Sequence, residues 1–141
     1  MWKQIFTKTY PDVKKEAVWR LWTDINNWPR WHDDLVSCVL QGPFAVGNHF
    51  MLQPKGMKPI KIDITEVNEL SSFTDGTSFF GAKMYNTHAL EEAAEGLKIT
   101  NTLVVTGPLR WVWIKLVAQG VAASFPTETE ALIQQARGIH D

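Results

Sequence analysis

The feature that most constrains the fold is a succession of segments in which apolar and polar residues alternate, followed by one long helical pattern. The alternation is strongest over residues 59–67, where isoleucine stands at positions 60, 62 and 64. Such a period predicts a strand with one buried face. With the turn residues between the segments, it predicts strands over residues 3–10, 35–41, 48–53, 59–67, 72–74, 79–91 and 97–106. The short strand at 72–74 is predicted to turn at Asp75-Gly76.

Helical patterns occupy two places in the chain. Between the first two strands, two short helices are predicted over residues 13–23 and 24–27, with Pro29 interrupting the second. After the last strand, residues 109–123 follow a helical period, and Ser124-Phe125-Pro126 should kink or break this helix before a second segment at 127–137. The stripe that we predict to face inward comprises Leu109, Val112, Trp113, Leu116, Val117 and Gly120.

The order of these elements predicts an α+β fold. Short connections between successive strands favour antiparallel neighbours, so the strands should form one antiparallel sheet of six or seven strands. The apolar face of the sheet must be buried against the only long helix, which comes last in the chain. One helix cannot fill a strongly curved sheet along its whole length. We therefore expect a cavity at one end, and such cavities commonly bind small molecules.

Composition narrows the classes of function. The chain has 141 residues, which suits a single domain over residues 1–141. Its net charge of −1 gives no electrostatic basis for binding nucleic acid, and it contains no apolar run long enough for integral membrane association. A single cysteine, Cys38, cannot form an internal disulfide. This indicates a reducing compartment and predicts a cytoplasmic protein.

One segment carries a family resemblance that the order of the other elements supports. The segment VWRLWTDINNWPRW, at residues 18–31, resembles the polyketide cyclase/dehydrase and lipid transport family of the START/Bet v 1-like (SRPBCC) superfamily. The resemblance implies a helix-grip fold, in which a curved sheet wraps around a long C-terminal helix and leaves a deep hydrophobic pocket. Relatives bind lipids, hormones, polyketides or other aromatics, and a minority are enzymes without a shared catalytic motif. By the same resemblance, Trp28 and Trp31 mark the mouth of the pocket.

Two polar residues are predicted among the apolar side chains of the inner sheet face. His88 lies on that face of residues 79–91, and Asn101 lies on that face of residues 97–106. Buried His and Asn side chains need hydrogen-bond partners. The two residues therefore either present hydrogen bonds to a ligand or bond each other, a neighbouring threonine or a buried water. The predicted ligand-binding residues are Trp28, Trp31, Met84, His88, Leu90, Ile99, Asn101, Leu103, Trp113 and Leu116.

Other residues that could carry chemistry are interpreted as structural. His32-Asp33-Asp34 is interpreted as a solvated turn with a helix-end cap. Cys38 has no nearby basic residue in the sequence, which predicts an inert thiol. The histidines stand at positions 32, 49, 88 and 140 without a metal-binding spacing, so neither a metal nor a cofactor is expected.

Three functions compete at this point. The first is binding of a hydrophobic small molecule in the cavity, which predicts a preformed cavity. The second is a cyclase- or dehydratase-like enzyme, in which His88 is the candidate acid or base, faces the cavity and has an orienting partner. The third is a regulatory module that acts by protein contact, with a collapsed interior and an exposed apolar patch. Trp111 lies opposite Trp113 on the predicted helix, where it either packs under the first helices or forms a contact in a homodimer.

Overall fold

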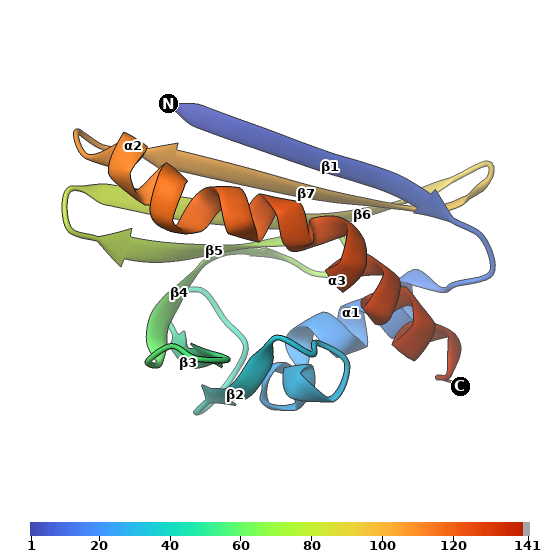
Figure 1. The fold of residues 1–141 in the computed structure, drawn as a ribbon. Coiled ribbons are helices and arrows are strands. Elements are labelled where there is room, and N and C mark those ends of the chain that lie inside the picture. The colour runs from blue at the N-terminus through green and yellow to red at the C-terminus, as the bar shows by residue number, and fades with distance from the viewer. Residues whose placement is uncertain (140–141) are drawn as a thin grey trace.

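Seven strands form one curved antiparallel sheet in the computed structural model, which describes residues 1–139 (Figure 1). The strands are β1 (Trp2–Tyr10), β2 (Leu35–Leu40), β3 (His49–Pro54), β4 (Ile60–Asn68), β5 (Ser72–Phe79), β6 (Ala82–Ala93) and β7 (Gly96–Thr106). Their order across the sheet is β1-β7-β6-β5-β4-β3-β2. All neighbours except β1 and β7 are therefore consecutive in sequence, and the predicted antiparallel sheet is confirmed.

The strand β5 is longer than the sequence predicts. Asp75 and Gly76 lie inside β5 and pair with β6, so the prediction of a turn there is wrong. The chain turns instead at Phe80-Gly81, where Gly81 has a φ of +75°. Gly76 belongs in the strand because a Cβ at this position would lie only 3.2 Å from the ring of Tyr85 on β6. This glycine therefore allows a close approach between two strands, and it keeps Asp75 on the sheet.

Two short helices follow β1, as predicted: the α-helix α1 (Lys15–Thr23) and the 3₁₀-helix η1 (Ile25–Arg30). Pro29 lies inside η1 and does not end it, which corrects the prediction of an interruption. A proline removes only one hydrogen bond from so short a helix. The chain beyond Pro29 is held by the carbonyl of Trp28, which accepts hydrogen bonds from the backbone N–H groups of Trp31 and His32.

The C-terminal helical region is continuous from Arg110 to Arg137. It comprises α2 (Arg110–Trp113), a π-helical turn η2 (Ile114–Ala118) and α3 (Gln119–Arg137). Pro126 lies inside α3, so of the predicted kink or break the break does not occur, and Figure 1 shows that the helix bends in its C-terminal half. The packing of both halves of the helix on other elements maintains helical structure past the proline.

The predicted inward stripe of this helix is correct only in part, because Leu116, Val117 and Gly120 face the space between helix and sheet but are not packed in a core. Leu109, Val112 and Leu116 are exposed, with relative accessibilities of 39%, 49% and 70%. The buried residues of the helical region are instead Ile114, Ala118, Phe125, Thr129, Leu132, Ile133 and Ala136. Because apolar residues cover all sides of the helix between Leu109 and Val121, its periodicity does not indicate which side faces the sheet.

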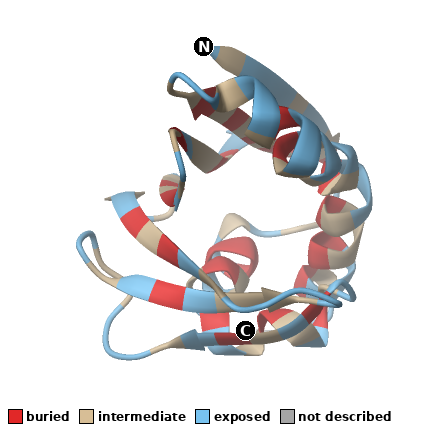
Figure 2. Cartoon of the chain, turned by 60° about the vertical axis from the view of Figure 1, so that its left-hand side comes forward, coloured by how far each residue is buried: buried red, intermediate tan, exposed pale blue. Residues whose placement is uncertain are grey.

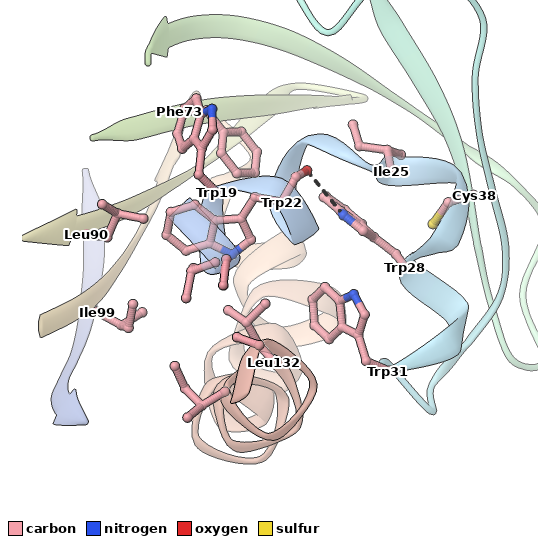
Figure 3. Close-up of a cluster of buried hydrophobic side chains, with 14 of the residues drawn as sticks. Trp19, Trp22, Ile25, Trp28, Trp31, Cys38, Phe73, Leu90, Ile99 and Leu132 are labelled. Carbon is pink, nitrogen blue, oxygen red and sulfur yellow. Dashed lines mark hydrogen bonds between the residues drawn. The ribbon is translucent and has the colours of Figure 1, made fainter. Parts of the chain in front are cut away.

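The larger core cluster lies between the first helices, the sheet and the C-terminal half of α3 (Figure 3). Phe73 is fully buried at its centre, and its ring lies 5.6 Å from the ring of Trp22 and 5.2 Å from that of Phe44. The Trp28 indole donates hydrogen bonds to the carbonyls of Leu21 and Trp22, at 3.0 and 3.2 Å. Most of the tryptophans near the N-terminus thus stabilise the packing of the first helices against the sheet.

A second, smaller core cluster fills the space between the N-terminal half of the helical region and strands β1, β6 and β7. It is formed by Ala82, Leu103, Val105, Ile114, Ala118 and Phe125. Figure 2 shows the helical region along one side of the molecule, with the sheet curving around to the other side. The helix covers β7 and β1 directly, whereas β3 and β4 lie opposite it. Within residues 1–139, no helix combines the length and apolar character required to cross a membrane.

Candidate ligand cavity

A cavity of about 340 Å³ lies between the sheet and the C-terminal helical region. One wall comes from β3 and β4, where Phe50, Leu52, Ile60 and Ile62 point inward. The opposite wall comes from the helical region and is lined by Leu116, Val117, Gly120 and Val121. Phe50 and Ile62 also belong to the larger core cluster, so the cavity adjoins that cluster. The structure therefore has an apolar cavity between sheet and helix, whereas the sequence predicted one at an end of the sheet.

The inner surface of the cavity contains a buried pair of polar side chains on neighbouring strands. Asp75 on β5 and His88 on β6 are 8% and 7% exposed, and both line the cavity. The Asp75 Oδ2 atom lies 3.0 Å from Nε2 of His88, so the imidazole donates this hydrogen bond to the carboxylate. The His88 ring stacks on Phe73 with a centroid separation of 4.3 Å and an interplanar angle of 12°. These contacts hold the imidazole in one orientation.

Two further polar residues lie beside this pair. Asn86 is directly opposite Asp75 in the pairing of β5 with β6, and it also lines the cavity. Its Oδ1 atom is buried and has no hydrogen-bond partner in the described part of the chain. Thr77, two residues after Asp75 on the same strand face, is 4% exposed and lines the cavity as well. The sheet thus presents a small polar strip inside an otherwise apolar cavity.

A second polar pair joins the first helices to α3 at the edge of the cavity. His32 Nε2 lies 3.3 Å from Glu128 Oε2, and both residues line the cavity. Burial lowers the pKa of His32, but the hydrogen bond and charge of Glu128, together with two neighbouring aspartates, outweigh it and raise the pKa above its ordinary value. The interpretation of residues 32–34 as a solvated turn is therefore wrong for His32, whose side chain is 14% exposed.

The His32–Glu128 pair predicts a pH-dependent contribution to stability. Because the folded-state pKa of His32 is raised, the contribution is complete below the ordinary histidine pKa of about 6.5 and is lost as the pH rises through the folded value. We expect Glu128→Gln to lower the free energy of unfolding by up to about 1 kcal/mol at about pH 5.5 and by less at about pH 8.5. Urea denaturation of both proteins at the two pH values measures this, and an equal or larger loss at the higher pH would contradict it.

Cys38 lies on β2 in the larger core cluster, away from the cavity lining. Burial raises the pKa of its thiol to about 12. A thiol reacts through its thiolate, so Cys38 in the folded protein should react with Ellman's reagent near pH 8 far more slowly than in urea. Fast labelling of the native protein would show that this part of the core opens readily.

The chain was compared with known protein families and curated sequences. A model of the family described as polyketide cyclase/dehydrase and lipid transport matches residues 5–136, which is most of the chain. The chain therefore belongs to the polyketide cyclase/dehydrase and lipid transport family. The family predicted from the segment at residues 18–31 is thus confirmed. No functionally curated protein sequence matches the chain.

Solved structures agree with this family in their fold. Protein MLL2253 from Mesorhizobium loti is 14% identical, with a TM-score of 0.75 over 95% of this chain and 96% of that protein. Ara h 8.0201 is 15% identical, with a TM-score of 0.71 over 96% of this chain and 98% of its own. The di-domain ARO/CYC BexL from the BE-7585A biosynthetic pathway is 17% identical, with a TM-score of 0.73 over 96% of this chain and 46% of its own. The helix-grip fold of the START/Bet v 1-like family is therefore the fold of this protein.

Four of the predicted ligand-binding residues line the cavity of this family member. They are Trp28, Met84, His88 and Leu116. Met84 and His88 do so because they lie on the concave face of β6, at the positions that the alternation predicts. Leu116 lines the cavity at its exposed edge, since it is 70% accessible to solvent. Whether these residues contact a ligand stays a prediction.

The other six predicted residues lie outside the cavity lining, because other elements cover them. They are Trp31, Leu90, Ile99, Asn101, Leu103 and Trp113. Leu90 and Ile99 pack in the larger core cluster, and Leu103 packs in the smaller one. Trp31 packs beside Trp28, with ring centroids 6.3 Å apart. The four of them that lie on β6 and β7 are on the inner side of the sheet but pack against other elements there, whereas Trp31 follows η1 and Trp113 lies on α2.

Asn101 and Trp113 make hydrogen bonds within the protein. The Asn101 amide donates to the hydroxyl of Thr129 on α3 at 3.3 Å. Trp113 stacks on Phe79, with centroids 4.5 Å apart, and its indole N–H donates to the carbonyl of Phe80 at 2.7 Å. Although Asn101 is paired with His88 in the sheet register, the two side chains make separate hydrogen bonds. Of the alternatives left open for Asn101, the threonine partner is correct.

Sequence reasoning missed Asp75, Thr77 and Glu128 as cavity residues. A signal for the first two existed, because Phe73, Asp75, Thr77 and Phe79 stand at every second position. Reading Asp75-Gly76 as a turn hid this period. Glu128 had no such signal, since its position beside His32 depends on how α3 docks on the first helices. Within residues 1–139, no group of three side chains of the metal-binding types is arranged around a common point, and His140 lies outside the described residues.

Proposed function

We propose that the protein binds a hydrophobic small molecule, such as a lipid, a polyketide or another aromatic compound, in the cavity between the sheet and the C-terminal helix. The observation that carries this proposal is the cavity of about 340 Å³ with apolar walls on both the sheet and the helix. Ligand sites in proteins begin at about 300 Å³ and are mostly apolar with a few polar groups. The polar strip of Asp75 and His88 supplies such groups.

The apolar walls are sufficient for useful affinity. A ligand that buries on the order of 300 Å² of apolar surface gains about 7 kcal/mol at about 25 cal/mol per Å². Part of this gain is offset by the loss of translational and rotational freedom. The polar strip then serves orientation more than affinity. Residues Trp28, Met84 and Leu116 are the contacts that we propose for the apolar part of the ligand.

Native mass spectrometry of freshly purified protein tests this function. We expect a species heavier than the polypeptide that loses an apolar molecule on activation. If only the free polypeptide appears, titration with a panel of lipids, flavonoids and polyketide mimics follows, with the emission of Trp28 and the other tryptophans as the signal. Failure of every compound in the panel, together with the free polypeptide in the spectrum, would contradict the proposal.

A second candidate function is catalysis by His88, and the Asp75–His88 hydrogen bond favours it. A carboxylate that orients an imidazole in a cavity is an arrangement suited to general acid–base chemistry. His88 would remove a proton from the carbon between two carbonyls of a bound β-diketone, as a cyclisation or dehydration requires. Incubation of an aryl 1,3-diketone in deuterated water, followed by NMR, measures the exchange. Exchange that is no faster than with His88→Gln would exclude this function.

The remaining proposals concern a regulatory role, the cellular location and the oligomeric state. A regulatory module with a collapsed interior is disfavoured by the open cavity. We propose that the protein is cytoplasmic, which the free and buried Cys38 supports, and that it can form a homodimer. Support for the dimer comes from Trp111, which is 62% exposed and does not pack under the first helices. Sedimentation velocity of the protein and of Trp111→Ser measures this association.

A further inference from the structure

We infer that Asp75 is the anchor for the polar head of the ligand, and that the cavity accepts neutral or cationic hydrogen-bond donors, such as hydroxyl or amine groups, and rejects carboxylates. This inference rests on the proposed function, because it assigns a ligand class to the same cavity. It follows from the charges and hydrogen bonds of the lining residues.

Asp75 has one carboxylate oxygen without a partner among the described residues. In the part of the chain that the structure describes, the side chain of Asp75 makes one hydrogen bond, from Nε2 of His88 to Oδ2. The second oxygen, Oδ1, therefore retains its lone pairs on a residue that is 8% exposed and lines the cavity. A carboxylate has capacity for about four hydrogen bonds and can only accept them. A ligand group that donates a hydrogen bond completes this site.

The charged side chains around the cavity are acidic. Three carboxylates line it, from Asp34, Asp75 and Glu128, and no lysine or arginine within residues 1–139 does. The two histidines of the lining each face a carboxylate already, His88 at 3.0 Å and His32 at 3.3 Å. Neither imidazole is therefore free to neutralise an anionic ligand. A carboxylate that entered the cavity would meet like charges in a region of low dielectric constant.

Asn86 lies directly opposite Asp75 in the strand register. Its buried Oδ1 atom also has no donor within the described residues. Buried polar groups without partners cost stability, and natural proteins contain few of them. Asn86 therefore offers Asp75 no evident donor from the facing strand position, and a ligand hydroxyl or amine would supply one to the Asp75 carboxylate.

Three biphenyl compounds of nearly equal shape test the inference. They are 4-phenylphenol, 4-methoxybiphenyl and biphenyl-4-carboxylate, and their binding is measured by isothermal titration calorimetry near pH 7, where the phenol is neutral and the acid is ionised. We expect the phenol to bind about tenfold more tightly than the ether and the carboxylate to bind most weakly. Equal affinities, or tightest binding of the carboxylate, would overturn the inference and leave the proposed function intact. Failure of all three compounds to bind would instead contradict the proposed function.

Asp75→Asn is expected to increase the affinity for one ligand, and misfolding of the variant would not produce an increase. This substitution keeps the shape of the side chain and removes its charge, so we expect biphenyl-4-carboxylate to bind about tenfold more tightly than to the unaltered protein. The preference for the phenol over the ether should fall at the same time. Asp63→Asn is the matched control, because it makes the same change of charge on β4 outside the cavity lining, beside Lys61. If Asp63→Asn raises carboxylate binding as much as Asp75→Asn does, net charge explains the effect and the anchor is wrong.

Discussion

Phe73→Ala should lower the free energy of unfolding by about 3–5 kcal/mol, the largest loss of stability that we expect from a single truncation in this protein. Phe73 has no exposed surface and lies at the centre of the larger core cluster. Its ring is within 6.5 Å of the rings of Trp19 and Trp28, and it stacks on His88. Alanine would leave a cavity that these stiff rings cannot fill. Urea denaturation followed by circular dichroism, with an unchanged m-value, measures the loss.

Phe80→Ala is the control for this prediction. Phe80 lies in the turn after β5 and is 82% exposed, so the same truncation should change stability by no more than about 0.5 kcal/mol. Losses of similar size at the two positions would show that the aromatic cluster does not dominate stability. Because His88 stacks on Phe73, the alanine variant should also loosen the orientation of the imidazole.

Gly120→Phe should reduce ligand binding by about tenfold or more without unfolding the protein, and this is the largest functional effect that we expect. Gly120 lines the cavity from α3, and a Cβ built on it meets nothing within 4 Å. A phenylalanine at this position therefore has room for its first carbon and places its ring in or across the cavity. Glycine in a helix interior is unfavourable by roughly 0.5–1 kcal/mol relative to alanine, so the substitution should not lower helix stability. Titration with the neutral fluorescent probe N-phenyl-1-naphthylamine measures binding.

Gly120→Ala is the control for Gly120→Phe, because it replaces the glycine without adding a side chain large enough to block the cavity. It should retain probe binding and raise the free energy of unfolding by roughly 0.5–1 kcal/mol, because it removes the same backbone flexibility and adds only one methyl group. If the phenylalanine variant binds the probe as well as the alanine variant does, the probe lies outside the cavity between sheet and helix. That outcome would also remove the main support for the proposed function.

The candidate site could be predicted in part because strand periodicity shows which residues share a face. Met84 and His88 were identified in this way, and both line the cavity. Ile99 and Leu103 share the same concave side but are covered by helices, one in each core cluster. The alternation of apolar and polar residues along a strand indicates which residues share a face of the sheet. It carries no information on which helix, if any, covers each of those residues. The cavity occupies the part of this face where the helical region lies across from the sheet without filling the space between them.

The amino-acid sequence alone indicated the family, a sheet of six or seven strands with antiparallel pairing between consecutive ones, and a final helix packed on the sheet. These features follow from local patterns and short connections, which act over a few residues. Only the tertiary structure shows which side of the helix is buried and that the helix continues through Pro126. It also shows that Glu128 lies beside His32. It also decided that Asp75 bonds His88 across two strands. Those contacts depend on the docking of segments distant in sequence and on the space left between them, and no local pattern encodes that space.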